Sequence, residues 1–169
     1  MTIENESPYS QPSIEILEPV DSGLYGSVYR AIQQPFGRQV AVKIIKSDMP
    51  NAADALAHGK LVARANHPAM VTVYGIEQVC IPGNAATVPA IIMEWVEGEK
   101  FGKHLGRERF TISQATSICK GVLDGIAYLH SIGLCHGDLH LGNVIVLPDG
   151  GVKIIDIDAN KDVSLARLS

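Results

Sequence analysis

The feature that most limits what this chain can fold into is one stretch, HGDLHLGNVIVLPDGGVKIIDID, at residues 136–158. Two aliphatic runs, NVIVL and VKIID, are joined by PDGG, a pattern that predicts two short strands and a tight turn. Asp149 lies in that turn, where turn chemistry accounts for it. Asp156 ends the second apolar run, where an unpaired carboxylate would be costly to bury. Polar side chains at fixed offsets around buried strands therefore indicate a site.

The polar residues of this stretch have the chemistry that phosphoryl transfer needs. His136, Asp138 and Asn143 form the pattern H-x-D-x-x-x-x-N, and Asp156 follows Asp138 by 18 residues. Phosphoryl transfer requires a carboxylate beside the acceptor hydroxyl and oxygen ligands for Mg²⁺, which prefers carboxylate, amide oxygen and water. Asp138, Asn143 and Asp156 would supply both. The alternative is a polar hairpin in which the Asp residues cap turns.

The rest of the chain predicts a sheet-rich first half and a helix-led second half, divided near Gly98. Residues 1–13 are polar and indicate a flexible tail. Five strands are expected from the runs IEILEPV, GSVYRAI, RQVAVKIIK, AMVTVYGIEQV and VPAIIMEWV, with an Ala-rich helix over residues 51–65. A short helix in EGEKFGKHL precedes a long one over residues 111–131, which Gly133 ends. The apolar residues of the long helix recur at spacings of three and four, at Ile112, Ala115, Ile118, Val122, Ile126 and Leu129.

Two further features are ambiguous by themselves. Gly23 and Gly26 lie between two strands, where glycines let backbone amides approach a phosphate closely, but an ordinary hairpin turn explains them as well. Lys43 is a single cation in an apolar strand, and it either extends to solvent or pairs with phosphate. Alternation does not decide between these, because both faces of that strand carry apolar residues.

Composition excludes several classes of protein. A net charge of −4 without a Lys/Arg run argues against nucleic-acid binding. The N-terminus lacks the basic and apolar regions of a signal peptide, and no apolar run is long enough to span a membrane. Three Cys at irregular spacing give neither a disulfide framework nor a zinc pattern. We therefore expect a soluble, cytoplasmic protein that binds neither nucleic acid nor membrane.

Taken in order, six blocks between about residues 14 and 158 resemble the catalytic domain of eukaryotic-like Ser/Thr protein kinases found in bacteria. The blocks are SGLYGSVYRA, VAVKIIK, NHPAMVTVYG, IIMEWVEG, GIAYLHSIGLCHGDLHLGN and KIIDID. The resemblance implies an α+β, protein-kinase-like fold. A five-stranded antiparallel N-lobe with one helix would span residues 14–97, and a partial, mainly helical C-lobe would span residues 98–169. ATP would bind between the lobes.

The resemblance also implies a role for each matching residue. Asp138 would orient the substrate hydroxyl and accept its proton, Lys43 would neutralise the α- and β-phosphates, and Asn143 with Asp156 would hold Mg²⁺. His136 would be structural. These groups are expected to converge on one triphosphate. The residues that would surround the nucleotide come from the glycine-rich loop, the lysine strand, the gatekeeper and the hinge: Gly23, Leu24, Tyr25, Gly26, Ser27, Val28, Ala41, Lys43, Met93, Glu94, Trp95 and Val96.

The first half departs from the family pattern at two positions. Asp21 replaces the first glycine of the loop, which adds a carboxylate near the phosphates or serves only to turn the strand. His58 stands where the family's helix carries the Glu that pairs with the strand lysine, and a neutral imidazole cannot form that ion pair. Asp54 is the only nearby carboxylate substitute. Lys43 would then be less firmly held.

The catalytic loop departs as well. Gly137 replaces the usual Arg, so control by phosphorylation of an activation segment is not expected. His140 stands where Ser/Thr kinases carry a Lys, and HGDLHLGN also resembles aminoglycoside- and choline-kinase-like enzymes. Ile157 and Asp158 replace the Phe-Gly that usually follows the metal-binding Asp.

Only 11 residues follow Asp158, so the family's activation segment and peptide-binding half are missing from this chain. We expect either a fragment of a longer reading frame or a partner, because the long helix should expose apolar surface. The leading hypothesis is an ATP- and Mg²⁺-dependent protein Ser/Thr kinase acting on a protein substrate. The alternatives are a kinase for a small-molecule hydroxyl acceptor and a nucleotide-binding pseudokinase or interaction module.

Overall fold

The computed structural model describes residues 13–23, 26–45, 59, 62–81, 83, 86–105, 107 and 110–157. Its contacts divide the chain into two compact units, residues 1–52 with 76–95 and residues 53–75 with 96–169, and each unit is described by itself. The lobe limits drawn from the sequence, 14–97 and 98–169, stay a prediction. Several sequence expectations fall outside the described residues: the tail up to residue 12, most of the helix over 51–65, Leu24, Tyr25, Asp54, His58 and Asp158.

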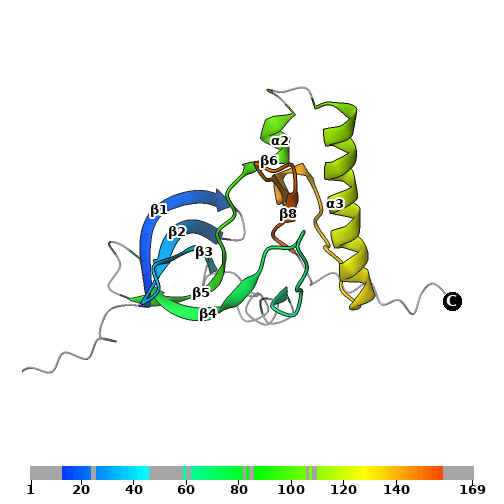
Figure 1. The fold of residues 1–169 in the computed structure, drawn as a ribbon. Coiled ribbons are helices and arrows are strands. Elements are labelled where there is room, and N and C mark those ends of the chain that lie inside the picture. The colour runs from blue at the N-terminus through cyan, green and yellow to red at the C-terminus, as the bar shows by residue number, and fades with distance from the viewer. Residues whose placement is uncertain are drawn as a thin grey trace, which may run out of the picture. The chain divides into compact units, whose positions relative to one another are not determined.

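The first unit is built on a five-stranded sheet with strand order β1-β2-β3-β5-β4 (Figure 1). The strands are β1 (Ile14–Gly23), β2 (Gly26–Gln33), β3 (Arg38–Ile45), β4 (Val73–Cys80) and β5 (Thr87–Glu94). β1 pairs with β2, β2 with β3, and β3 with β5, each time antiparallel. The predicted five-stranded antiparallel sheet is confirmed.

The two faces of this sheet differ in character. Alternate residues on the strands build one apolar core from Ile14, Ala31, Val40, Val42, Ile44, Val79, Ala90 and Ile92. Each large aliphatic side chain buried there contributes about 1.5–3 kcal/mol. The pairing register places Val28 opposite Lys43, and Arg30 opposite Ala41, which is itself opposite Met93. Because side chains alternate along a strand, these five residues share the other face.

The second unit combines helices with a small sheet. Its elements are β6 (Glu99–Lys100), α2 (Phe101–His104), α3 (Ile112–Ser131), the 3₁₀ turn η1 (Leu141–Asn143), β7 (Val144–Val146) and β8 (Val152–Ile154). The three strands form a sheet in the order β6-β7-β8, with α3 alongside β8 (Figure 1). Asp149 accepts a hydrogen bond from the backbone N–H of Gly151 at 2.8 Å, as expected of a turn residue.

Helix α3 begins and ends as its sequence predicts. Thr111 and Gln114 form a reciprocal capping box at the first turn. Gly133, two residues past the helix, has φ +77°, a left-handed conformation that glycine adopts without a steric cost. Gly125 is buried, and a Cβ there would lie 2.8 Å from the Met70 side chain, so the glycine allows the helix to approach that segment closely.

Two details of the second unit differ from the sequence expectation, and a third agrees with it. Ile112 belongs to the predicted apolar stripe of α3 but is 88% exposed, because it lies on the first turn, before the helix reaches the core. Leu123 is 68% exposed on the same helix, so α3 does carry exposed apolar side chains. The strand expected from Ala69 begins only at Val73, because Ala69 and Val71 instead exchange backbone hydrogen bonds with Ile154 on β8.

No helix within the described ranges is both long enough and apolar enough to cross a membrane. The cysteines Cys80, Cys119 and Cys135 are all free thiols.

Candidate functional site

The candidate site lies on the segment that connects α3 to β7. Gly137 has φ +76° there. An L-residue with a side chain rarely adopts that conformation, so the backbone explains why glycine occupies this position. The segment therefore turns at Gly137, between His136 and Asp138.

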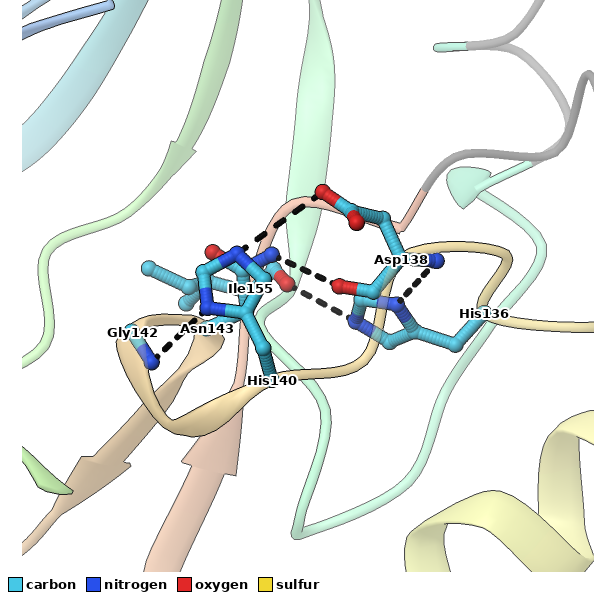
Figure 2. Close-up of polar contacts among 6 residues, drawn as sticks. All are labelled: His136, Asp138, His140, Gly142, Asn143 and Ile155. Carbon is cyan, nitrogen blue, oxygen red and sulfur yellow. Dashed lines mark hydrogen bonds and ion pairs between the residues drawn. The ribbon is translucent and has the colours of Figure 1, made fainter. Parts of the chain in front are cut away.

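His136 holds the segment against the chain that follows β8 (Figure 2). Its side chain is 4% exposed. Its Nε2 lies 3.0 Å from the carbonyl oxygen of Ile155, and its Nδ1 lies 3.4 Å from the backbone nitrogen of Asp138. Because Nδ1 must accept and Nε2 must donate, the ring is neutral with its proton on Nε2. Burial lowers the pKa of His136, against the opposing effects of the Ile155 carbonyl and the charges of Asp138 and Asp156.

Asp138 is fixed through its backbone, whereas its carboxylate is accessible. The backbone N–H of Asp138 faces His136, and its carbonyl accepts a hydrogen bond from the Asn143 side chain. The side chain of Asp138 is 52% exposed, and its Oδ2 lies 3.7 Å from Nε2 of His140. His140 is positioned in turn by the backbone N–H of Gly142, which donates to Nδ1 at 3.0 Å. A carboxylate on a rigid backbone that solvent still reaches is suited to act on an external hydroxyl.

Asn143 is the buried centre of the loop. Its Nδ2 donates to the Asp138 carbonyl at 2.9 Å, and its backbone N–H donates to the His140 carbonyl at 2.9 Å. Its own carbonyl accepts from the N–H of Ile155 at 3.0 Å. These bonds fix the orientation of the carboxamide, so that its nitrogen faces the loop and its oxygen is the atom that could bind a cation.

Asp156 has the left-handed backbone conformation, with φ +56°, and no other described residue except glycine has a positive φ. Asp tolerates this conformation better than most residues. Ile155, the residue before it, is bound on both sides, through its N–H to Asn143 and through its carbonyl to His136. The half-buried Asp156 is therefore positioned by the same network that fixes Asp138 and Asn143.

The donor atoms of this network fit a magnesium ion that is bound together with phosphate. Within the described ranges, no three His, Cys, Asp or Glu residues form a cluster that could hold a metal by themselves. Asn143 and Asp156 offer one amide oxygen and one carboxylate. Mg²⁺ usually takes few protein ligands and completes its shell with water and substrate phosphates, so two oxygen ligands suffice.

Lys43 and most of the residues expected to surround the nucleotide lie in the first unit. Lys43 is half-buried on β3, on the face opposite the sheet core, which it shares with Val28, Ala41 and Met93. Gly26 has φ +151° and pairs with Gly23 at the start of β2, followed by half-buried Ser27. The expected hinge residues, all half-buried, come at the end of β5: Glu94, Trp95 and Val96.

The structure thus brings Asp138, Asn143 and Asp156 into one network, while the convergence of Lys43 with them stays a prediction. Asp21 accepts a hydrogen bond from the adjacent backbone N–H of Ser22 at 2.9 Å, which supports its role in turning the strand. Sequence reasoning missed Ile155, whose backbone groups connect Asn143 to His136. No side-chain signal could have found it, because any non-proline residue offers the same N–H and carbonyl.

Comparison with known proteins adds independent information. The family model for the protein kinase domain matches residues 14–167. The serine/threonine-protein kinase PknA of Mycobacterium tuberculosis is 30% identical over 155 residues, which cover 89% of this chain and 36% of that protein. The probable serine/threonine-protein kinase PknB of Bifidobacterium longum is 30% identical over 146 residues, covering 81% and 21%. The serine/threonine-protein kinase mos of Gallus gallus is 30% identical over 166 residues, covering 86% and 47%. The chain thus spans less than half the length of each of these relatives.

Proposed function

This chain belongs to the protein kinase family, and we propose that it supplies the ATP- and Mg²⁺-binding part of a phosphotransferase that phosphorylates Ser or Thr hydroxyls of proteins. The observation that carries the proposal is the hydrogen-bonded network around His136 and Ile155, which holds Asp138, Asn143 and Asp156. A hairpin that only capped its own turns would need neither the buried imidazole nor the left-handed Asp156.

Asp138 orients the acceptor hydroxyl and accepts its proton in this proposal. Its accessible carboxylate and its doubly held backbone support that role. Phosphoryl transfer asks little covalent chemistry of the protein, and most of the rate gain comes from positioning and charge stabilisation. The contribution of Asp138 would therefore be mainly geometric, because the backbone that carries its carboxylate is held on both sides.

Asn143 and Asp156 would hold Mg²⁺, which neutralises charge on the phosphates when it is bound. Both are held through neighbouring groups: Asn143 through its amide nitrogen and backbone, and Asp156 through the bound peptide of Ile155. Ligands that are held in place before the ion arrives lose less conformational entropy when they bind it.

The nucleotide would bind between the lobes, against the face of the first sheet that carries Val28, Ala41, Lys43 and Met93. Lys43 would pair with the α- and β-phosphates, the backbone of residues 23–28 would cover them, and the backbone of Glu94–Val96 would bond adenine. The apolar members of this face would form the walls of an adenine pocket.

Thermal denaturation tests the proposal. ATP with Mg²⁺ should raise the midpoint of unfolding, and ATP alone should raise it less, because a ligand that binds only the folded state stabilises it. Asp156→Asn, which keeps a residue that tolerates the left-handed backbone, should abolish the Mg²⁺-dependent part. Asp149→Asn, in the β7–β8 turn, is the matched control. Equal shifts for the wild type with and without Mg²⁺ would refute the metal assignment.

A second candidate is a kinase for a small-molecule hydroxyl acceptor. It is favoured by His140, which lies 3.7 Å from Asp138 where protein Ser/Thr kinases carry a Lys. Transfer from labelled ATP to a generic protein, compared with an aminoglycoside and choline panel, separates the two. Nucleotide binding without transfer to either class of acceptor would favour the pseudokinase alternative.

A further inference from the structure

Arg30 on β2 makes an arrangement that none of the proposed catalytic roles explains. Its Nη1 lies 3.3 Å from Oε1 of Glu18 on β1, and its Nη2 donates to Oε1 of Gln39 on β3 at 3.0 Å. The centre of the guanidinium lies 5.3 Å from the centroid of the Trp95 ring. One side chain thus connects three strands of the first unit to the residue that follows β5.

The guanidinium is better suited to this position than any other cation. Nε of Arg30 is buried, and among the described residues no acceptor lies within hydrogen-bond range of it. A buried donor without an acceptor is costly, but the electron-rich face of an indole ring offsets part of that cost. The planar guanidinium can bind Glu18 and Gln39 along its edges while it stacks on the ring, which a lysine ammonium cannot do.

The location of this contact connects it to the proposed nucleotide site. Arg30 pairs in register with Ala41, and Ala41 with Met93, so Arg30 lies on the same face of the sheet as Lys43. Trp95 is the middle residue of the segment Glu94–Val96, whose backbone would bond adenine. When Arg30 holds the Trp95 ring, the backbone of Glu94–Val96 is restricted before a ligand binds. Less conformational entropy is then lost on binding.

We propose that Arg30 is a positioning residue for the nucleotide: lying over Trp95 and held by Glu18 and Gln39, it fixes the segment that would bond adenine. This inference rests on the proposed function, because it assumes that adenine binds at Glu94–Val96. Arg30 itself does not touch the reacting atoms. Its influence should appear in the affinity for the base and not in the phosphoryl-transfer step.

The test uses the whole chain and two readouts. Trp95 is the single tryptophan, so intrinsic fluorescence reports on it alone. Arg30→Met, which keeps an unbranched apolar stem but removes the guanidinium, should increase acrylamide quenching of Trp95 without any ligand. The same substitution should weaken the binding of ADP and of adenosine, measured by calorimetry, by about three- to tenfold. Binding of inorganic tripolyphosphate should not change.

Two variants serve as controls. Arg30→Lys retains a cation that can lie over the ring and should recover part of the adenosine affinity, which a loss of packing alone would not allow. Arg38→Ala removes another arginine of the same sheet, which bonds Gln33, and should leave both readouts unchanged.

The outcomes separate the inference from the function on which it rests. Unchanged quenching in Arg30→Met, or unchanged adenosine affinity despite increased quenching, would overturn the positioning role even if the wild type binds ADP. A wild type that binds neither ADP nor adenosine would overturn the proposed function, and the positioning role with it. Increased quenching together with weaker adenosine binding and unchanged tripolyphosphate binding supports both.

Discussion

At the scale of single residues, this site depends on a histidine that takes no part in the proposed chemistry. His136 donates from Nε2 to the Ile155 carbonyl and accepts at Nδ1 from the Asp138 N–H. Protonation of Nδ1 would place a hydrogen against that N–H and break the second contact. The loop therefore requires the neutral imidazole, in agreement with the lowered pKa that burial causes.

The stability of the protein should fall as the pH is lowered from about 6.5, the usual pKa of an unfolded histidine. Because burial lowers the folded-state pKa of His136, the unfolded chain takes up the proton first, and unfolding becomes easier until the pH reaches the folded-state pKa. Above the unfolded pKa the contribution is complete. Denaturant titrations of the wild type and His136→Gln at several pH values measure this effect.

His136→Gln should be less stable than the wild type at pH 7, by about 1–3 kcal/mol, and should have a flatter pH profile below that. His130→Gln, on the exposed last turn of α3, is the matched control and should follow the wild type. Parallel profiles for the wild type and His136→Gln would show that His136 is not the titrating group.

At the scale of elements, α3 is defined by its ends and by its two glycines. The capping box at Thr111 places the start of the helix, and Gly133 places its end. Inside the helix, a Cβ at Gly121 would lie 2.7 Å from the Val152 side chain, and one at Gly125 would lie 2.8 Å from that of Met70. Both glycines lower the helix propensity. Because they have no Cβ, the helix can pack closely against β8 and the segment before β4.

Thr111→Ala should destabilise the protein by about 1 kcal/mol, because it removes the side-chain acceptor for the Gln114 N–H. Thr111→Ser keeps the hydroxyl and should be close to the wild type, and both substitutions are at an exposed position. Denaturant unfolding measures the difference. Equal stabilities of the Ala and Ser variants would mean that the cap contributes nothing in this context.

At the scale of the whole molecule, the proposed function would require the two units to act on one ligand. The first unit offers Lys43, and the second offers Asn143 and Asp156 on a rigid loop. Each unit has its own apolar core, one around Val40, Val42 and Ile92 and the other around Met70, Leu129 and Ile154. Separate cores allow each set of functional groups to be rigid by itself, so the ligand would supply the coupling between them.

A double-mutant cycle tests this coupling. Lys43→Met and Asp156→Asn should each weaken the binding of ATP with Mg²⁺, and the double variant should lose less than the sum of the two losses. The difference should be roughly 0.5–3 kcal/mol, as for groups that share one partner. Calorimetric affinities provide the numbers, with Asp149→Asn as the control. Strictly additive losses would contradict the convergence of Lys43 and Asp156 on one triphosphate.

The sequence by itself predicted most of the described elements and the chemical types of side chain in the candidate site. Alternation of β-branched residues predicted the strands of the five-stranded sheet, and the spacing of apolar residues with the stop residue Gly133 predicted α3 almost to the residue. The spacing of His136, Asp138, Asn143 and Asp156 predicted a phosphate and magnesium chemistry, because catalysis restricts which side chains can occupy fixed offsets. Each of these patterns involves residues that are close together in the chain, so one sequence is enough to recognise it.

Only the tertiary structure decided how these parts are held. Both faces of β3 carry apolar residues in the sequence, and only the pairing register shows that Lys43 lies on the face opposite the core. The left-handed backbone of Asp156, the Ile155 bridge and the Arg30–Trp95 contact could not be predicted. The physical reason is that backbone hydrogen bonds leave no side-chain signature, and that contacts between residues distant in the chain arise from packing and not from local periodicity.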